Sequence, residues 1–244
     1  MAVKREIMAQ MASADLHLTN WGTNFYWAAT GIFNVAAIAF FAAGLASRKH
    51  LVRVLYFLSA LSCYIACLAY FAMGANMGWT AVQVEFPRDH RLEAPPTRQV
   101  FWVRAVVTPL STVMLSMLTD LSPQLITMEV VMSLLVIITG LVSALIPTSF
   151  KWAYFGYGAV PWAGVTYLVM RTGYQHISGK HPTRRGRYLV CAVFCMSLFL
   201  MYGVVWGLSE GGNVVSVDVE GLLYGLADLF GIGFNGLVVW AASV

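Results

Sequence analysis

The chain has 244 residues, of which 59% are hydrophobic and only 11% are charged, and its formal net charge is +4. Soluble domains carry about a quarter charged residues, so this composition argues against a water-soluble protein and indicates a membrane protein. The positive charge is no evidence for nucleic-acid binding, because membrane proteins gather basic residues in their cytoplasmic loops.

Apolar segments follow one another along the chain, and each is long enough to cross a bilayer as a helix. Continuous apolar runs of this length favour helices over the alternating strands of a membrane barrel. The predicted fold class is therefore an all-α membrane protein, a seven-transmembrane-helix bundle. We expect the helices at about 22–46, 51–75, 98–118, 124–146, 150–172, 187–208 and 219–243.

The charges between these segments predict how the bundle is oriented. The loops after the first, third and fifth segments carry most of the basic residues and a single carboxylate, Asp120. The positive-inside rule places these loops in the cytoplasm. We therefore expect residues 1–21 to form an extracellular N-terminal segment, residues 22–244 to form the membrane domain, and the C-terminus to be cytoplasmic.

Three charged residues lie inside the predicted helices. Arg104 in the third helix and Asp228 in the seventh have opposite sign and lie at compatible depth from the outer side. A charge at the bilayer centre costs at least about 2.5–3.5 kcal/mol, so we expect these two residues to form a buried ion pair, directly or through water. The pair either fixes helix packing or belongs to an ion or ligand path. Glu129, near the cytoplasmic end of the fourth helix, is expected to reach the headgroups and is assigned no role.

The residues that usually carry enzyme or metal chemistry do not form a recognisable pattern. The cysteines occur as Cys63 with Cys67 and Cys191 with Cys195, and those stretches hold no histidine or carboxylate that could complete a metal site. The histidines all lie in or beside predicted loops, and no nucleophile–base pair or phosphate-binding loop appears. We therefore expect no enzyme activity and no metal.

Several stretches resemble one known family. The segment NMGWTAVQVEF follows the second predicted helix, RQVFWVR begins the third, and IITGLVSALIPTSFKWAYFGYG joins the fourth to the fifth. MYGVVWGLSEGG and VEGLLYGLADLFGIGF occupy the sixth and seventh. Together they resemble the microbial (type 1) rhodopsins, and best the fungal branch of opsin-related proteins, which includes stress-induced yeast membrane proteins that lack the retinal-binding lysine.

The resemblance implies that the retinal attachment point is missing. In the family, a lysine four residues after a buried aspartate of the seventh helix holds retinal as a Schiff base. Asp228 matches the aspartate, but the position of the lysine is occupied by Ile232. A Schiff base needs a primary amine, so no covalent retinal is expected, and non-covalent retinal remains a minor alternative. The lysines of the chain lie elsewhere, at Lys4, Lys49, Lys151 and Lys180.

Other family positions can be carried over one at a time. Arg104 matches the arginine of the third helix, and Glu210 and Glu220 match the outer carboxylates that release protons in pumping relatives. For both glutamates, solvated loop ends are the simpler interpretation. Gly203 stands where the family has proline. The resemblance implies a ligand pocket at Tyr70, Phe199, Tyr202, Trp206, Asp228 and Ile232, although ordinary helix packing also explains the aromatic residues.

The third helix departs most from a proton pump. Pumping relatives have a carboxylate one turn after the arginine and another two turns further in. These positions are Val107 and Leu118 here, with Thr108 in place of a tryptophan, and in an alternative register Val103 takes the first position. Asp120 lies beyond the second position and is expected to be a loop charge.

Three hypotheses about function follow from the resemblance. The first is a non-photochemical, stress-related opsin-like membrane protein that is not a light-driven proton pump and acts through membrane partners or on membrane homeostasis. The second is a non-covalent binder of retinal or another lipophilic ligand. The third is a passive ion or proton path through Arg104, Asp228, Glu210 and Glu220. The expected surroundings are the lipid bilayer of the plasma membrane and, by resemblance, a homotrimer, with no nucleic acid.

Overall fold

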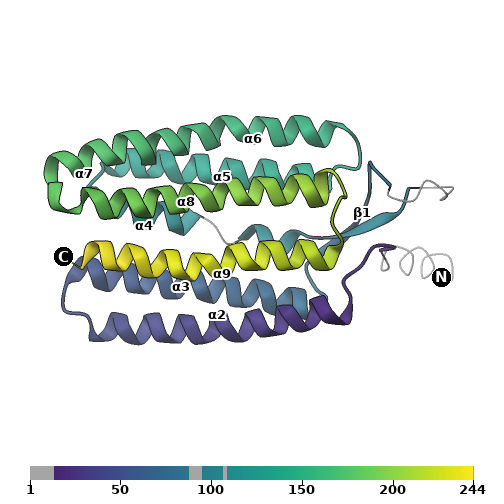
Figure 1. Ribbon diagram of the computed structural model, residues 1–244, viewed down its shortest axis with the longest axis horizontal. Helices are drawn as coiled ribbons and strands as arrows, with labels where there is room; N and C mark the ends of the chain where they lie inside the picture. Colours follow the sequence, from purple (N-terminus) through teal and green to yellow (C-terminus); the bar gives the residue numbers. More distant parts are fainter. Residues whose placement is uncertain (1–13, 88–94, 107–108, 244) are drawn as a thin grey trace.

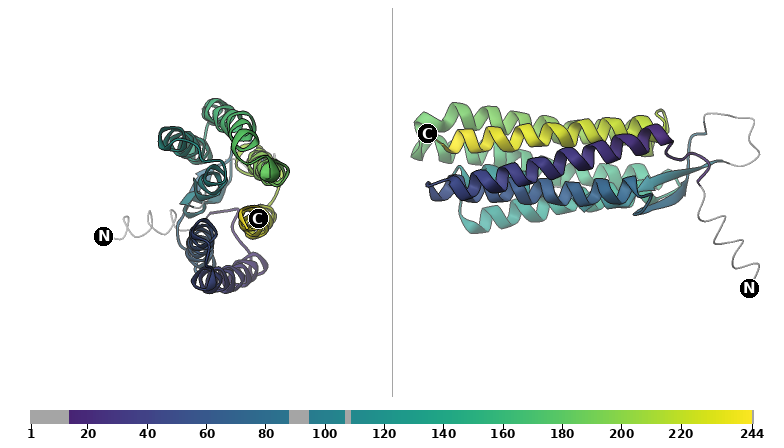
Figure 2. Two further views of the ribbon diagram at one scale, coloured as in Figure 1. Left: turned by 90° about the vertical axis from the view of Figure 1, so that its left-hand side faces the viewer. Right: turned by 90° about the horizontal axis from the view of Figure 1, so that it is seen from below.

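The computed structural model describes residues 14–87, 95–106 and 109–243. The described helices lie side by side with their axes roughly parallel, and they are arranged in a ring when the bundle is seen from one end (Figures 1 and 2). A short β-hairpin lies at one end of the bundle, here called the hairpin end, and the C-terminus lies at the opposite end (Figure 1). The elements in chain order are α2 (Asn20–Ala46), α3 (His50–Gly74), β1 (Trp79–Gln83), β2 (Thr97–Phe101), η1 (Trp102–Val106), α4 (Pro109–Met117), α5 (Pro123–Leu145), α6 (Phe150–Tyr167), η2 (Leu168–Gly173), α7 (Tyr174–Lys180), η3 (Pro182–Arg184), α8 (Arg185–Trp206), η4 (Gly207–Gly211) and α9 (Val217–Ala242).

The predicted seven-helix architecture is confirmed in the described residues. The bounds of the first, second, fourth and seventh predicted helices agree with α2, α3, α5 and α9 to within two residues. Five described stretches are long and apolar enough to cross a membrane, namely α2, α3, α5, Pro182–Gly211 and α9. The fifth predicted helix ended too early at 172, because α6 continues through the π-helical turn η2 and α7 to Lys180. Pro182 comes two residues later and marks the break.

Local signals explain where the well-predicted helices begin. Ser122 caps α5 by accepting a hydrogen bond from the backbone N–H of Leu125, and Pro123 follows at the first helical position, where its missing N–H is harmless. Ser216 caps α9 in the same way through Val219. Asp218 lies in the first turn of α9, where a carboxylate is favoured by the helix dipole.

The start of the third predicted helix was wrong. Residues 98–101, expected to be helical, belong to β2, which pairs antiparallel with β1 in the register Trp79–Phe101 to Gln83–Thr97. Leu16 adds to the free edge of β2, since its N–H donates to Thr97 O and its carbonyl accepts from Gln99 N, both at 2.9 Å. These extended backbone groups therefore find partners between strands instead of within a helix. The first α-helix that the structure describes after β2 is α4, from Pro109 to Met117.

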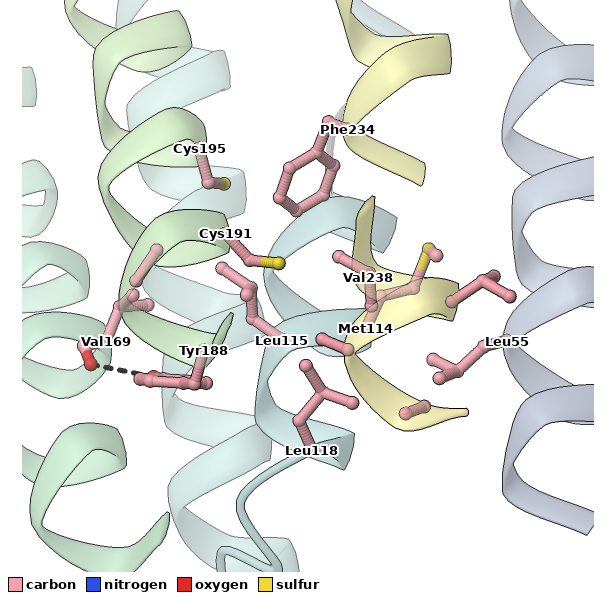
Figure 3. Packing of buried hydrophobic residues seen from close by; sticks show 14 of the residues in the cluster. Leu55, Met114, Leu115, Leu118, Val169, Tyr188, Cys191, Cys195, Phe234 and Val238 are labelled. Atoms are coloured by element: carbon pink, nitrogen blue, oxygen red, sulfur yellow. Dashed lines mark hydrogen bonds between the residues drawn. The ribbon is translucent and has the colours of Figure 1, made fainter. Parts of the chain in front are cut away.

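The apolar core divides along the length of the bundle. Toward the opposite end, α4, α8 and α9 interlock through Leu115, Cys191 and Phe234, which are each less than 2% exposed (Figure 3). Toward the hairpin end, α2 and α3 pack through aromatic rings such as Tyr26 and Tyr70, whose centroids are 5.7 Å apart. The polar groups of the candidate site lie beside this aromatic half.

Candidate functional site

The site is centred on Asp228, which α9 presents to the interior with 9% of its surface exposed. Tyr70 of α3 donates a hydrogen bond to Oδ2 of Asp228 at 2.5 Å. Tyr202 of α8 donates to the other carboxyl oxygen, Oδ1. Side chains from α3, α8 and α9 thus converge on one carboxyl group, whose partners are hydroxyl groups.

Arg104 and Asp228, expected to pair directly or through water, form no direct ion pair in the described residues. Arg104 instead binds Glu220, with Nη1 and Oε1 2.8 Å apart, and its Nη2 donates to the Tyr26 hydroxyl at 2.9 Å. Arg104 lies in the 3-10 turn η1 directly after the hairpin, so its guanidinium remains near the hairpin end. Glu220 lies in the first turn of α9, whereas Asp228 is about two turns deeper.

Glu220 also binds a second arginine, Arg98, which lies at the start of the third predicted helix. Nη2 of Arg98 lies 2.6 Å from Oε2 of Glu220, and the two side chains are 2% and 0% exposed. Arg98 further donates to Asn213 Oδ1 at 2.7 Å and to the carbonyl oxygen of Val215 at 2.8 Å. Arg98 reaches these partners because it lies in β2, which directs its side chain into the bundle. The prediction of a helix at residue 98 therefore could not reveal these contacts.

Glu210 lies on the same side of the bundle as this cluster. Its carboxylate accepts hydrogen bonds from Ser209 Oγ and from the Tyr224 hydroxyl, the latter at 3.1 Å. The Tyr224 ring also faces the Arg104 guanidinium at 4.4 Å. Interpreting Glu210 and Glu220 as solvated loop ends was therefore wrong, because both belong to a connected polar cluster with Arg104.

A cavity of about 540 Å³ opens from this polar cluster between α5, α6 and α8. Phe199, Tyr202, Trp206 and Asp228, all expected at a pocket, contribute to its walls. Trp206 is held in place by stacking on Phe155, with centroids 4.3 Å apart. The rest of the lining is mostly apolar and comes from residues such as Val136, Ile137, Leu141 and Ala159.

Three buried N–H donors in the cavity wall have no acceptor in the part of the chain that the structure describes. They are Nε of Arg104 and the indole Nε1 atoms of Trp162 and Trp206. Burying such a donor unpaired typically costs about 1–3 kcal/mol. The cavity thus combines apolar walls with hydrogen-bond donors that a molecule bearing acceptor oxygens could satisfy.

Ile232 lines a separate cavity of only about 50 Å³, together with Cys63 and Asn235. Phe199, Tyr202 and Asp228 contribute to the walls of both cavities. The expected pocket residues are therefore divided between two spaces, and Ile232 is not part of the larger one. Tyr70 contacts Asp228 but lines neither cavity.

Only some of the third-helix positions that differ from pumping relatives lie within the described residues. Val107 and Thr108 lie outside them. Val103 packs into the aromatic half of the core, and Leu118 is buried at 2% exposure. Asp120 is exposed in a turn beside His181, as expected for a loop charge. Glu129 was predicted to reach the headgroups, but it is only 1% exposed and faces α4, where Ser116 donates a hydrogen bond to it.

The described lysines do not offer an amine to the larger cavity. Lys49 Nζ donates to the carbonyl oxygen of Ser243 at 2.5 Å, and Lys180 Nζ to that of Asp120 at 3.4 Å, both at the end opposite the hairpin. Lys151 Nζ donates to the carbonyl oxygen of Glu210 at 3.0 Å. Because residue 232 is isoleucine and these amines are engaged elsewhere, the described residues do not fit a covalently bound retinal.

Comparisons with known proteins agree with the architecture. The profile of a family described as bacteriorhodopsin-like protein matches residues 21–244. The opsin-like protein carO of Fusarium fujikuroi is 30% identical over 233 residues, which cover 93% of this chain and 75% of the relative. The 30 kDa heat shock protein of Saccharomyces cerevisiae is 28% identical over 240 residues, covering 88% and 70%. Among solved structures, a light-driven proton pump of Coccomyxa subellipsoidea superposes with a TM-score of 0.82 at 25% identity, covering 92% of this chain and 98% of the pump.

Proposed function

Because the chain belongs to the bacteriorhodopsin-like family, we propose that it is an opsin-related membrane protein that works without a retinal Schiff base and does not pump protons in response to light. The observation that carries this proposal is Ile232, which stands where the family resemblance expects the lysine. The positions of Lys49, Lys151 and Lys180 support it, since each amine is bound to a backbone carbonyl away from Ile232.

The lack of acidic residues in the third helix supports the same proposal. Residues 105–119 contain no carboxylate, so no acceptor or donor of the family's kind is available there. Asp228 is stabilised by Tyr70 and Tyr202 and does not require a positively charged Schiff base as its partner. Relatives include both a protein named opsin-like and one named a heat shock protein. We therefore propose a role in a stress response at the plasma membrane, with the hairpin end outside.

The larger cavity supports a second candidate function, the non-covalent binding of a lipophilic ligand. Its volume of about 540 Å³ falls within the range of about 300–1,000 Å³ that is typical of small-molecule sites. The unpaired donors of Arg104, Trp162 and Trp206 favour a ligand that carries neutral acceptor oxygens, such as a carbonyl group. This candidate agrees with the first, since binding without an amine involves no Schiff base.

A retinal titration of the purified protein tests both candidates. We expect no red-shifted absorption band that survives acid denaturation, because residue 232 is isoleucine and the described lysines do not line the cavity. A surviving band would show a covalent Schiff base and contradict the first proposal. Quenching of tryptophan fluorescence that is reversed by denaturation would support the non-covalent candidate, and the absence of quenching would count against retinal as its ligand.

A matched pair of substitutions locates the binding. Gly203 lines the larger cavity, and a side chain added there first meets Phe155 at 3.7 Å. Gly203→Leu should therefore take up part of the cavity and reduce the quenching. Gly156 on α6 is exposed and has nothing within 4 Å of an added Cβ, so Gly156→Leu should leave the quenching unchanged. Equal effects of both substitutions would mean that retinal binds outside the cavity.

A further inference from the structure

A second polar cluster lies in the half of the bundle away from the hairpin, between α4 and α5. Thr112 and Ser116 are one turn apart on α4, and Glu129 and Ser133 are one turn apart on α5. Ser116 donates a hydrogen bond to Oε2 of Glu129, and the Thr112 and Ser133 hydroxyl oxygens are 3.4 Å apart. These four side chains, here called the polar ladder, are at most 2% exposed.

Glu129 is the titratable member of the polar ladder, and the described residues place no cation against it. Its Oε1 is buried and has no hydrogen-bond partner among those residues. None of the ion pairs in the described part of the chain involves Glu129. Apart from Ser116, the Thr112 hydroxyl is the polar group that acts on the carboxyl. From α8, Tyr188 and Cys195 bring further titratable groups into its electrostatic range, and both are neutral in their protonated forms.

The neutral acid is therefore the form of Glu129 that these surroundings favour. A lone buried carboxylate costs several kcal/mol, and such groups generally take up a proton instead. Leu115, Leu118 and Cys191 belong to the apolar core of this half of the bundle and offer no compensating charge (Figure 3). The hydrogen bond between Ser116 and the carboxyl can also run from the acid to the serine, since a hydroxyl group both donates and accepts.

Polar groups continue from the polar ladder toward the nearby end of the bundle. Thr119 donates to the carbonyl oxygen of Ser116 at 2.8 Å. Asp120 follows it in the chain and contacts His181, with Oδ2 and Nε2 3.1 Å apart and side chains that are 57% and 39% exposed. Both side chains are in contact with water at this end of the bundle.

We propose that Glu129 is a proton-binding site of this membrane protein, occupied by a proton in the resting state and exchanging it through the end of the bundle where Asp120 and His181 are exposed. The site lies on α5 and thus differs from Leu118, the position on the third helix at which pumping relatives carry a carboxylate. It is independent of the cavity and of the proposed absence of a Schiff base, because it requires no ligand other than the proton.

Infrared spectroscopy of the purified protein tests the proposal at neutral pH. The wild-type protein should show the C=O stretching band of a protonated carboxyl that shifts to lower frequency in D₂O and is lost in Glu129→Gln. Asp228→Asn serves as the control and should retain this band. Ser116→Ala should move the band to higher frequency without abolishing it, because the hydrogen bond to the carboxyl is lost.

Two outcomes would overturn the proposal. A wild-type spectrum identical to that of Glu129→Gln would show an ionised carboxylate, and a band that does not shift in D₂O would show a proton that never exchanges. Labelling with dicyclohexylcarbodiimide gives a second measurement that needs no variant. This lipid-soluble reagent adds to protonated carboxyl groups, so peptide mass spectrometry should find the adduct on Glu129 at neutral pH and less of it at high pH. An unlabelled Glu129 at every pH would also contradict the proposal.

Discussion

At the scale of single residues, the interior charges are arranged so that two arginines share one glutamate. Arg98 and Arg104 approach different oxygens of Glu220, at 2.6 and 2.8 Å. Asp228, by contrast, is bound by hydroxyl groups. Glu220 therefore stabilises two buried cations, while Asp228 stabilises none directly.

This difference predicts that two isosteric substitutions destabilise the protein to different extents. Glu220→Gln should destabilise the protein by about 3–5 kcal/mol, because it leaves buried arginines without their counter-charge. Asp228→Asn should cost less, since an amide can still hydrogen-bond with the tyrosine hydroxyls. Thermal unfolding of the two variants in one detergent compares them directly. A larger loss of stability in Asp228→Asn than in Glu220→Gln would indicate that Asp228 pairs with Arg104 after all.

The sequence could predict which residues are charged and buried but not how they pair. Arg104, Glu220 and Asp228 were all expected at the outer side of the bundle. Their pairing depends on a few ångströms of depth, which changes when residues 98–101 are extended rather than helical. Trp162 was missed because it has no counterpart in the family motifs, and a tryptophan in an apolar helix ordinarily indicates packing.

At the scale of elements, glycines on α9 allow α2 to approach closely. A Cβ on Gly221 would lie 2.5 Å from the Tyr26 hydroxyl, and one on Gly225 would lie 2.4 Å from Cε1 of Phe25. The four-residue spacing of Gly221 and Gly225 thus allows close packing between two helices of the same chain. It does not by itself indicate an oligomer.

Alanine at two glycines of α9 should therefore act in opposite directions. Gly225→Ala should destabilise the protein by about 1–3 kcal/mol, because the new methyl group overlaps the Phe25 ring. Gly231→Ala has nothing within 4 Å of the new Cβ and should stabilise it by about 0.5–1 kcal/mol through helix propensity. Unfolding temperatures measured side by side check this, and a neutral Gly225→Ala would mean that α2 is not packed this closely.

The helices were predictable and the hairpin was not, for one physical reason. In lipid a helix satisfies all its backbone groups locally, so the apolar segment itself reveals α2, α3, α5 and α9. Strands β1 and β2 lie at the end of the bundle and pair with each other across an intervening loop. Partners so distant in the sequence leave no periodic signal in composition.

At the scale of the whole molecule, the described residues that precede α2, residues 14–19, are attached to the hairpin end through Asp15 and Leu16. Asp15 Oδ2 accepts hydrogen bonds from the backbone N–H of Thr97 at 2.8 Å and from its hydroxyl at 3.0 Å. The backbone hydrogen bond from Thr97, followed by that of its hydroxyl, lowers the pKa of Asp15 below its ordinary value of 3.8. The contact thus favours the carboxylate and joins segments that are far apart in the sequence.

This attachment should depend on pH in a defined direction. A lowered pKa in the folded state contributes stability that is fully present above pH 3.8 and is lost as the pH falls through the folded-state value. Hydrogen exchange of the Thr97 amide should therefore accelerate below pH 3.8 relative to its intrinsic rate. Asp15→Asn should exchange rapidly already at neutral pH. A variant as protected as the wild-type protein would show that Asp15 does not fasten the segment.

The position of the larger cavity determines how a molecule would reach it. Leu200 and Val204 line the cavity and are 58% and 55% exposed on the outward face of α8, which faces lipid. A ligand would therefore enter sideways from the bilayer, and lipid acyl chains would compete with it for the same space. The occupancy of the cavity would follow the mole fraction of the ligand in the lipid. The same compound would therefore bind with different apparent affinity in membranes of different thickness or sterol content.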